Sequence, residues 1–176
     1  MSTLLIAMAG LPGTGKTTLA KALAEKLGAA VLDKDMLRAA LIEPERIEYS
    51  RKQNDAVYEL LLKGAIQYLR RGTPVILDGR TFTRKYQVER VVKFATENDA
   101  ELRMIECVCD EALALKRIRA DMEKGNHLAA DRGPELYRRL KNEAEPIEIE
   151  HLSVDTGGEL DSCVITCMKY LRNAAE

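Results

Sequence analysis

The stretch Gly10-Leu11-Pro12-Gly13-Thr14-Gly15-Lys16-Thr17 decides how the rest of this chain is interpreted. It matches the pattern G-x-x-x-x-G-K-[ST] of a phosphate-binding loop. The context fits as well, because the apolar run at residues 3–9 predicts a buried strand before the loop. The apolar spacing over residues 17–27 predicts a helix after it. A strand, this loop and a helix together predict a site for the phosphates of a nucleotide.

Each residue type in the loop has a physical reason. Three glycines let the backbone curl so that its N–H groups point at an anion, and the helix N-terminus adds partial positive charge. Lys16 is expected to reach the β- and γ-phosphates, and the Thr17 hydroxyl is expected to bind Mg²⁺. The residues of this segment predicted to bind the nucleotide are Gly10, Pro12, Gly13, Thr14, Gly15, Lys16, Thr17 and Thr18.

Length and composition indicate one compact domain over residues 1–176. Apolar residues make up 46% of the chain, which is enough for a packed core, and 27 basic residues balance 28 acidic ones. This balance predicts no general attraction to nucleic acid or to a membrane surface. No apolar run is long enough to span a membrane, and the N-terminal run lacks the basic flank of a secretion signal. We therefore expect a cytoplasmic protein.

The four cysteines allow two interpretations. Cys107 and Cys109 alternate on a predicted strand, and Cys163 and Cys167 are four apart on a predicted helix. A zinc site built from both pairs is one interpretation. The favoured one is that these are free thiols in the core, because free cysteine behaves as a small apolar residue and the flanking residues are apolar.

Short apolar runs alternate with helical patterns along the whole chain, which predicts a parallel sheet covered by helices. We expect the three-layer α/β/α fold of P-loop NTPases, with five strands and helices on both faces of the sheet. The strands are predicted at residues 3–9, 29–32, 74–77, 101–109 and 149–154. The helices are predicted at residues 17–27, 36–41, 52–71, 84–96, 111–123, 134–144 and 159–173. The polar segment 124–134, which contains Gly125 and Gly133, is predicted to be a small lid.

Acidic residues follow two of the predicted strands. Asp33 and Asp35 come after the second strand, and Asp78 ends the third. Ligands of parallel sheets bind beyond the carboxyl ends of the strands, so these carboxylates are expected beside the phosphate-binding loop. They would repel a polyphosphate unless a cation intervened, and Mg²⁺ prefers oxygen ligands. We predict Thr17, Asp33 and Asp78 as the Mg²⁺ site, the alternative for Asp78 being a role in capping the turn at Gly79.

Asp35 is predicted to be the general base. A carboxylate within hydrogen-bond reach of an acceptor hydroxyl can orient that hydroxyl and take its proton. Arg38 lies one helical turn further on and is predicted to bind an anionic group of the acceptor. The alternative is that the carboxylates at this position only cap the helix that follows.

Further basic residues have two interpretations. Arg119 and Arg132 are predicted to stabilise the charge that develops on the transferred phosphoryl group, although basic residues are also favourable near any helix C-terminus. The acceptor pocket is expected between residues 44–49 and the segment after Asp78. That segment contains Arg80, Thr81, Arg84 and Lys85, which would either line the pocket or cover a surface helix.

The combined pattern resembles the small P-loop kinases. It is similar to polynucleotide 5′-hydroxyl kinases, zeta toxins, chloramphenicol phosphotransferases and the small bacterial kinases of the AAA ATPase group. The resemblance implies ATP and Mg²⁺ as cofactors, Asp35 as the base, Arg38 on an acceptor phosphate, and lid arginines on ATP. It also implies that Arg117 stacks on adenine and that Thr156, in the segment 154–157, borders that base.

Three functions follow in order of preference. The first is an ATP-dependent kinase that acts on a hydroxyl of a small molecule. The second is a polynucleotide 5′-hydroxyl kinase, which is less favoured because the chain has only two Phe, six Tyr and no Trp to stack on bases and no room for a phosphatase domain. The third is a nucleotide-binding regulatory ATPase without an acceptor.

Overall fold

A computed structural model describes residues 2–123 and 133–172 of the chain, and strands and helices alternate along it. The described strands are β1 (Thr3–Ala9), β2 (Ala30–Asp33), β3 (Val75–Asp78), β4 (Ala100–Val108) and β5 (Leu152–Asp155). The helices are α1 (Lys16–Leu27), α2 (Lys34–Leu41), α3 (Arg51–Leu69), α4 (Lys85–Glu97), α5 (Glu111–Glu123), α6 (Pro134–Glu143) and α7 (Leu160–Arg172), with a 3-10 turn η1 (Pro44–Arg46).

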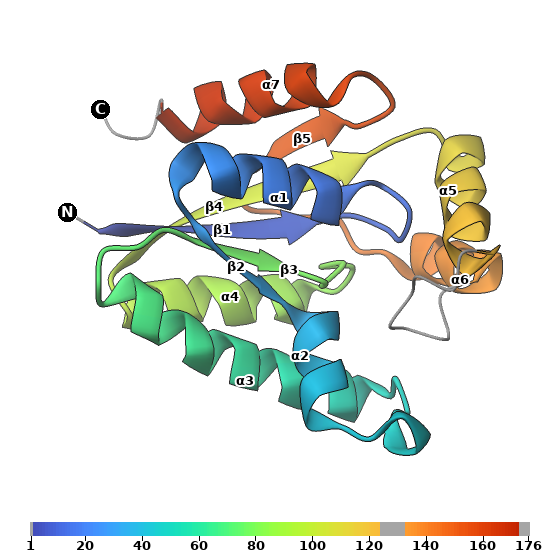
Figure 1. Ribbon diagram of the computed structural model, residues 1–176, viewed down its shortest axis with the longest axis horizontal. Helices are drawn as coiled ribbons and strands as arrows, with labels where there is room; N and C mark the ends of the chain where they lie inside the picture. The colour runs from blue at the N-terminus through green and yellow to red at the C-terminus, as the bar shows by residue number, and fades with distance from the viewer. Residues whose placement is uncertain (1, 124–132, 173–176) are drawn as a thin grey trace.

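The strands form a parallel sheet in the order β2-β3-β1-β4-β5 (Figure 1). β1 lies at the centre, between β3 and β4. The chain leaves β1 toward one edge of the sheet and leaves β3 toward the other, so the strand order reverses between these two strands. Ligands of open parallel sheets bind at such a reversal, beyond the carboxyl ends of the strands. The loop after β1 and the residues after β3 both lie there.

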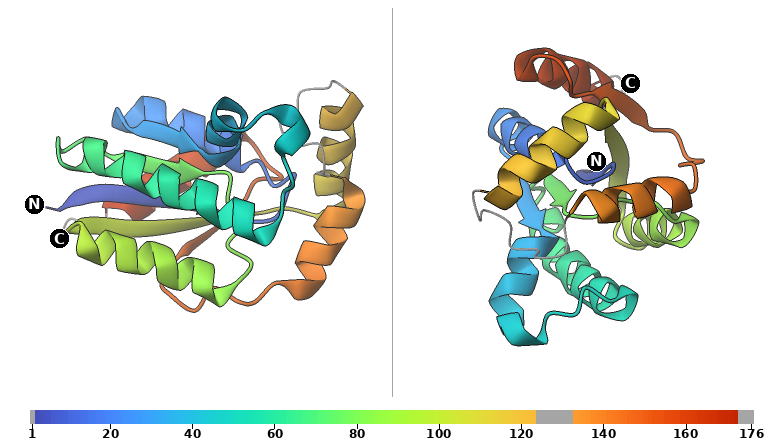
Figure 2. Two further views of the ribbon diagram at one scale, coloured as in Figure 1. Left: turned by 90° about the horizontal axis from the view of Figure 1, so that it is seen from below. Right: turned by 90° about the vertical axis from the view of Figure 1, so that its right-hand side faces the viewer.

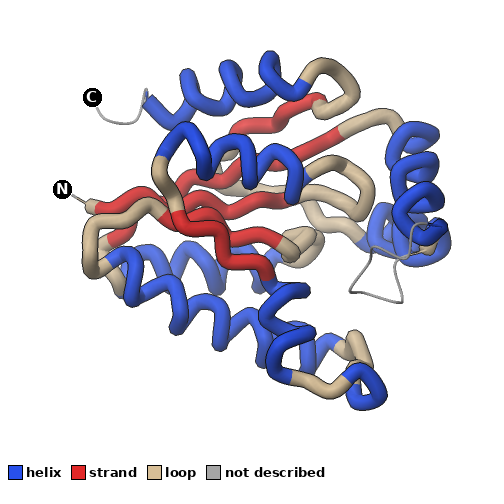
Figure 3. Tube along the Cα trace, in the orientation of Figure 1, coloured by secondary structure: helices blue, strands red, loops and turns tan. Residues whose placement is uncertain are grey.

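Alternate residues of β1 face two separate cores, as expected of a strand covered on both sides. Leu5, Ala7 and Ala9 pack against the helices α3 and α4, and Ile6 and Met8 pack against α1 and α7. Figure 3 shows the resulting three layers, with the strands between two layers of helices. The predicted fold class, a five-stranded α/β/α P-loop fold with helices on both faces, is confirmed for the described residues.

α5 and α6 lie beyond the carboxyl ends of the strands, apart from the two layers (Figure 2). They pack on each other through a small cluster made by Ala114, Leu115, Ile118 and Tyr137. The predicted lid, residues 124–134, joins these two helices, and residues 124–132 of it lie outside the described part of the chain. The helices on either side place their residues over the end of the sheet where the phosphate-binding loop lies.

Several predicted boundaries were wrong, and contacts explain the differences. α2 begins at Lys34 rather than at residue 36, because the Asp33 side chain caps it by accepting hydrogen bonds from the Asp35 and Met36 backbone. β5 begins at Leu152 rather than at residue 149, because Ile149 packs against the core under α3 and α4 instead of joining the sheet. Among the described helices, none combines the length and apolar character needed to cross a membrane.

Candidate active site

The phosphate-binding loop connects β1 to α1 in conformations that require its glycines. Gly10, Gly13 and Gly15 have φ angles of 125°, 76° and 77°. A Cβ atom at Gly10 would lie 2.3 Å from the carbonyl oxygen of Cys107, and one at Gly13 would lie 2.5 Å from that of Ala114. The neighbouring strand β4 and helix α5 therefore leave no room for a side chain at either position, which gives the sequence pattern its physical basis.

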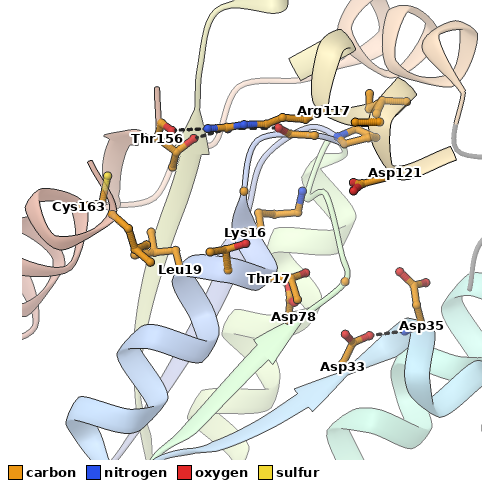
Figure 4. A pocket seen from close by; sticks show the side chains of 18 of the residues that line it. Lys16, Thr17, Leu19, Asp33, Asp35, Asp78, Arg117, Asp121, Thr156 and Cys163 are labelled. Carbon is orange, nitrogen blue, oxygen red and sulfur yellow. Dashed lines mark hydrogen bonds between the residues drawn. The ribbon is translucent and has the colours of Figure 1, made fainter. Parts of the chain in front are cut away.

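A cavity of about 600 Å³ opens beside this loop (Figure 4). This is within the size range of nucleotide and cofactor sites. Its walls include Pro12, Gly13, Gly15, Lys16, Thr17 and Thr18 from the loop and the start of α1. Gly10 and Thr14, also predicted to bind the nucleotide, are not in its wall. Thr14 is buried, and its hydroxyl donates to the Leu11 carbonyl oxygen at 2.8 Å, which stabilises the loop from within.

Asp78 is the least satisfied polar side chain in this cavity. It is 1% exposed, and neither of its carboxylate oxygens has a hydrogen-bond partner among residues 2–123 and 133–172. Its register partner on β2 is a second acid, Asp33, so two carboxylates lie side by side at the end of the sheet. A buried charge without a partner is costly, and like charges on adjacent strands repel.

This arrangement fits a divalent cation. Carboxylate oxygens together with a hydroxyl are the donors that Mg²⁺ prefers, and Thr17, Asp33 and Asp78 all line the same cavity. The sequence left two alternatives open, namely that the carboxylates after the second strand only cap the following helix and that Asp78 only caps the turn at Gly79. Asp33 does cap α2 through its Oδ1 atom, whereas the Asp78 carboxylate accepts no hydrogen bond from the residues that the structure describes. No cluster of three or more His, Cys, Asp or Glu side chains that could hold a metal occurs in the described part of the chain.

Asp35, on the first turn of α2, lies near two cationic side chains. Its Oδ1 atom accepts a hydrogen bond from Arg38 Nη1 at 3.1 Å and lies 4.0 Å from Lys34 Nζ. Arg38 is 2% exposed and also donates to the Asn54 side chain on α3. Asn54 Oδ1 accepts a second bond from Lys34 Nζ at 3.1 Å, and Asn54 Nδ2 donates to the Tyr49 carbonyl oxygen at 2.8 Å. One amide therefore fixes both cations beside Asp35.

A second cavity, of about 410 Å³, adjoins the first. The two share Pro12, Lys16, Asp35 and Gly79, so the predicted phosphate-binding lysine and the predicted base lie where they meet. The second cavity is walled by the start of α2, the start of α3, the loop between β3 and α4, and α6. Of the residues predicted to surround an acceptor, Arg38, Tyr49, Arg80, Thr81 and Arg84 line it. Lys85 does not, and is paired with Glu148 on the surface.

Arg117 and Thr156, which line the first cavity, are connected to the phosphate-binding loop by hydrogen bonds. Arg117 Nη2 donates to the Thr156 carbonyl oxygen at 2.8 Å, and Arg117 Nη1 lies 3.5 Å from the Gly13 carbonyl oxygen. The Thr156 hydroxyl donates to the Thr14 carbonyl oxygen at 2.7 Å. Both residues line the cavity, and both also fix the conformation of the phosphate-binding loop. Their contacts with adenine stay a prediction.

The predicted lid arginines are the least supported members of the site. Arg119 is exposed on α5 and lies in the wall of neither cavity. Arg132 lies outside the described residues. From the neighbouring elements, Asp121 of α5 lines the first cavity and Arg139 of α6 lines the second. The roles of Arg119 and Arg132 on ATP stay a prediction.

Three of the four cysteines occupy the positions that the favoured interpretation predicts. Cys107, Cys163 and Cys167 are buried in the apolar core beneath α1 and α7. Cys109 lies beyond the end of β4, is half-buried, and packs against the small cluster between α5 and α6 instead. Burial raises the pKa of the Cys107 thiol from 9.0 to about 12, and burial likewise raises the pKa of the Cys167 thiol to about 12. Both side chains are therefore neutral thiols at physiological pH.

Sequence reasoning missed Asn54, Asp55 and Tyr86, which line the second cavity. They sit on the exposed starts of α3 and α4, where polar residues are expected in any case, and no local spacing marks them. Only the packing of α3 beside α2 and α4 brings them to the site, so the sequence alone carried no signal for them.

Comparison with known proteins places this site in a family. The sequence profile of a family described as an AAA domain matches residues 5–143. An uncharacterized protein of Mycobacterium tuberculosis (strain ATCC 25618 / H37Rv) is 42% identical over 80 residues. That match covers 40% of this chain and 16% of the relative, so the chain corresponds to a small part of the relative's length.

Solved structures share the fold across nearly the whole chain. A protein of Chloroflexus aurantiacus classed provisionally as a kinase has a TM-score of 0.75 at 24% identity, covering 96% of this chain and 98% of its own. An APS kinase of Mycobacterium tuberculosis, in complex with AMPPNP and APS, has a TM-score of 0.75 at 16% identity, covering 97% and 98%. A gluconokinase of Sinorhizobium meliloti 1021 has a TM-score of 0.66 at 17% identity, covering 98% and 93%. The resemblance to small P-loop kinases is thereby confirmed at the level of the fold.

Proposed function

The chain belongs to this AAA domain family, and from that premise we propose that it is an ATP- and Mg²⁺-dependent phosphotransferase that moves the γ-phosphoryl group of ATP to a hydroxyl of a small molecule. The observation that carries the proposal is the junction of the two cavities at Lys16 and Asp35. A regulatory ATPase has no need of a second cavity that opens onto its predicted base.

The residues divide the chemistry between the two cavities. In the first, the loop N–H groups and the Lys16 ammonium group bind the phosphates of ATP, and Arg117 and Thr156 hold the loop in shape. Thr17, Asp33 and Asp78 would hold Mg²⁺, which when bound would supply positive charge that offsets the charge of the phosphates. In the second, Asp35 orients the acceptor hydroxyl and accepts its proton as the hydroxyl oxygen attacks the γ-phosphorus. The bond between the γ-phosphorus and the β,γ-bridging oxygen breaks in the same transfer, and ADP leaves with that oxygen. Arg38 donates a hydrogen bond to the Asp35 carboxylate and thereby holds it at the junction.

The size of the second cavity supports a small acceptor over a polymer. About 410 Å³ is typical of sites for metabolite-sized ligands. The APS kinase that shares the fold was solved with a nucleotide analogue and a small acceptor together. A 5′-hydroxyl oligonucleotide is the alternative acceptor, supported by Tyr49 and Tyr86 in the cavity wall, which could stack on bases.

Transfer of label from [γ-³²P]ATP tests the proposal. Alcohols, sugars, sugar acids, nucleosides and a 5′-hydroxyl oligonucleotide are offered in parallel, and ATP hydrolysis without acceptor is the background. We expect transfer to a small alcohol that Lys16→Ala abolishes and that Asp35→Asn lowers by about 10²- to 10⁴-fold, the usual contribution of a general base. AMPPNP affinity should change little in Asp35→Asn. Acceptor-independent hydrolysis alone would favour the regulatory ATPase, and transfer to the oligonucleotide alone would favour the polynucleotide kinase.

A further inference from the structure

The walls of the second cavity point to the chemistry of the acceptor. Resting on the phosphotransferase proposed above, we infer that the acceptor alcohol carries an anionic group, a phosphate or a carboxylate, and that Arg80 is the residue that binds it. Arg80 follows β3, two residues after Asp78, and Gly79 between them lines both cavities.

Positive charge is concentrated in this cavity although the chain as a whole has a net charge of −1. Apart from Lys16 at the junction, the described wall carries six cationic side chains and three acidic ones. The cationic residues are Lys34, Arg38, Arg51, Arg80, Arg84 and Arg139, and the acidic ones are Asp35, Asp55 and Glu143. A cavity with this excess of cations raises the local concentration of anions, and an uncharged alcohol would gain nothing from it.

Two arginines of the wall, Arg38 and Arg80, are buried, and each has a buried Nε atom without a hydrogen-bond partner in the described part of the chain. Arg38 already pairs with the predicted base Asp35 and with Asn54, so the arginine that we assign to an anion of the acceptor is Arg80. It is 6% exposed, and its guanidinium carbon lies 4.3 Å from the centroid of the Tyr58 ring, which holds the planar group in one orientation. The Nη2 atom donates to Asp55, a side chain 37% exposed at the rim. The buried Nε atom has no hydrogen-bond partner in the described part of the chain.

An ion pair with Asp55 alone does not account for this geometry. A rim salt bridge needs only the exposed end of the guanidinium group, and surface pairs contribute little to stability. Burying an arginine and leaving its Nε–H unpaired is costly unless a ligand completes the site. A phosphate or carboxylate oxygen is the partner that a guanidinium group binds best, through two parallel hydrogen bonds.

The positions of Asp35 and Arg80 indicate where the two groups of the acceptor would bind. Asp35 lies where the two cavities meet and would bind the reacting hydroxyl, and Arg80 lies in the wall built by the loop after β3. An acceptor with a hydroxyl at one end and an anion at the other would use both. The class we propose is therefore the small phosphorylated or carboxylated alcohols, with the anion as a requirement for binding.

Binding measurements separate this inference from the proposed function. AMPPNP and Mg²⁺ are first titrated alone, and failure of that titration would count against the proposed function and not against the subsite. Glycerol 3-phosphate, glycerate and glycerol are then titrated by calorimetry into the protein saturated with Mg·AMPPNP, so that the phosphate-binding loop is occupied. We expect the two anions to bind and glycerol to show no binding at the same concentrations. Equal binding of all three, or binding of none, would overturn the inference.

Three variants test the role of Arg80. Arg80→Gln is expected to weaken binding of glycerol 3-phosphate at least about tenfold, the effect of losing one hydrogen bond to a charged group. Asp55→Asn removes the competing anion and is expected to tighten binding, whereas a purely structural ion pair would make both variants fail alike. Arg90→Gln is the matched control. Like Arg80, Arg90 forms an ion pair with an acid of α3, in this case Glu59, but Arg90 lies in neither cavity wall. A wild-type affinity in Arg80→Gln would refute the assignment.

A 5′-hydroxyl tetranucleotide, a polymeric source of phosphate, is titrated in the same way. Tighter binding of the tetranucleotide than of glycerol 3-phosphate would refute the small-molecule class. Weaker or absent binding would support it.

Discussion

Asp78→Asn is expected to stabilise the protein and abolish its activity. The Asp78 carboxylate is 1% exposed, neither oxygen has a hydrogen-bond partner among the described residues, and Asp33 lies beside it in register. An unsatisfied buried polar group costs about 1–3 kcal/mol, and more when it is charged. Replacing the charge by an amide of the same shape removes most of the charged part of that cost and the repulsion from Asp33.

The magnitude follows from the same cost. We expect Asp78→Asn to raise the free energy of unfolding by about 1–3 kcal/mol in the absence of nucleotide, which raises the Tm by about 2–4 °C for each kcal/mol in a chain of this size. Mg²⁺-dependent stabilisation by AMPPNP should disappear. In the wild-type protein, that stabilisation is about 2.7 kcal/mol at a ligand concentration of 100 Kd.

Urea unfolding with and without Mg·AMPPNP measures both effects. Asp161→Asn is the control, because Asp161 is exposed in the first turn of α7 and lies in the wall of neither cavity, so the unfolding free energy should change by less than about 0.5 kcal/mol. A lower unfolding free energy in Asp78→Asn without nucleotide would contradict this prediction, because it would mean that the Asp78 carboxylate stabilises the fold in the absence of a bound cation.

Three further predictions concern residues around the cavities. Thr156→Val removes the hydrogen bond to the Thr14 carbonyl oxygen and should cost about 1 kcal/mol of unfolding free energy and weaken AMPPNP binding, whereas Thr166→Val, on the exposed face of α7, should do neither. Asn54→Ala should raise the KM for the acceptor substrate at least about tenfold, because Arg38 and Lys34 lose the side-chain oxygen to which both donate hydrogen bonds. The KM for ATP should stay within about twofold, and a larger change in the KM for ATP would contradict this prediction. Alkaline pH should destabilise the protein through its buried thiols. Below about pH 9 the Cys107 and Cys167 thiols are protonated in both states, and between about pH 9 and 12 only the unfolded state ionises, so the unfolding free energy falls as pH rises. The unfolding free energy, measured by denaturation at several pH values, should therefore fall more steeply with pH in the wild type than in the Cys107→Ala/Cys167→Ala double variant. Cys109→Ala is the control. An equal fall in the wild type and the double variant would contradict the role of these two thiols.

Local patterns made part of the site predictable. The phosphate-binding loop was predicted from the spacing of Gly10, Gly13, Gly15 and Lys16, which all lie within one short segment of the sequence. Asp33, Asp35 and Asp78 were found because parallel strands bring their carboxyl ends to one edge of a sheet, so a strand followed by an acid predicts the position of that acid. Neither inference needed the order of the strands, which the sequence did not specify.

Long-range packing made the rest unpredictable. Asn54 reaches Lys34 and Arg38 only because α3 packs beside α2, and Arg80 is buried only because Tyr58 of α3 lies under its guanidinium group. No spacing in the sequence predicts either contact. Arg38 was expected to bind the acceptor directly, and it also donates hydrogen bonds to Asp35, the predicted base, and to Asn54. The short β5 strand was misplaced because the chain before it packs on the other face of the sheet.

A crystal structure with Mg·AMPPNP bound would locate the γ-phosphoryl group and so decide whether it faces the predicted base. We expect this group at the junction of the two cavities, in contact with Lys16, with Asp35 on the side of the second cavity and the metal ion bound near Asp78. A triphosphate that points away from Asp35, or that leaves Asp78 without the metal ion, would contradict this expectation.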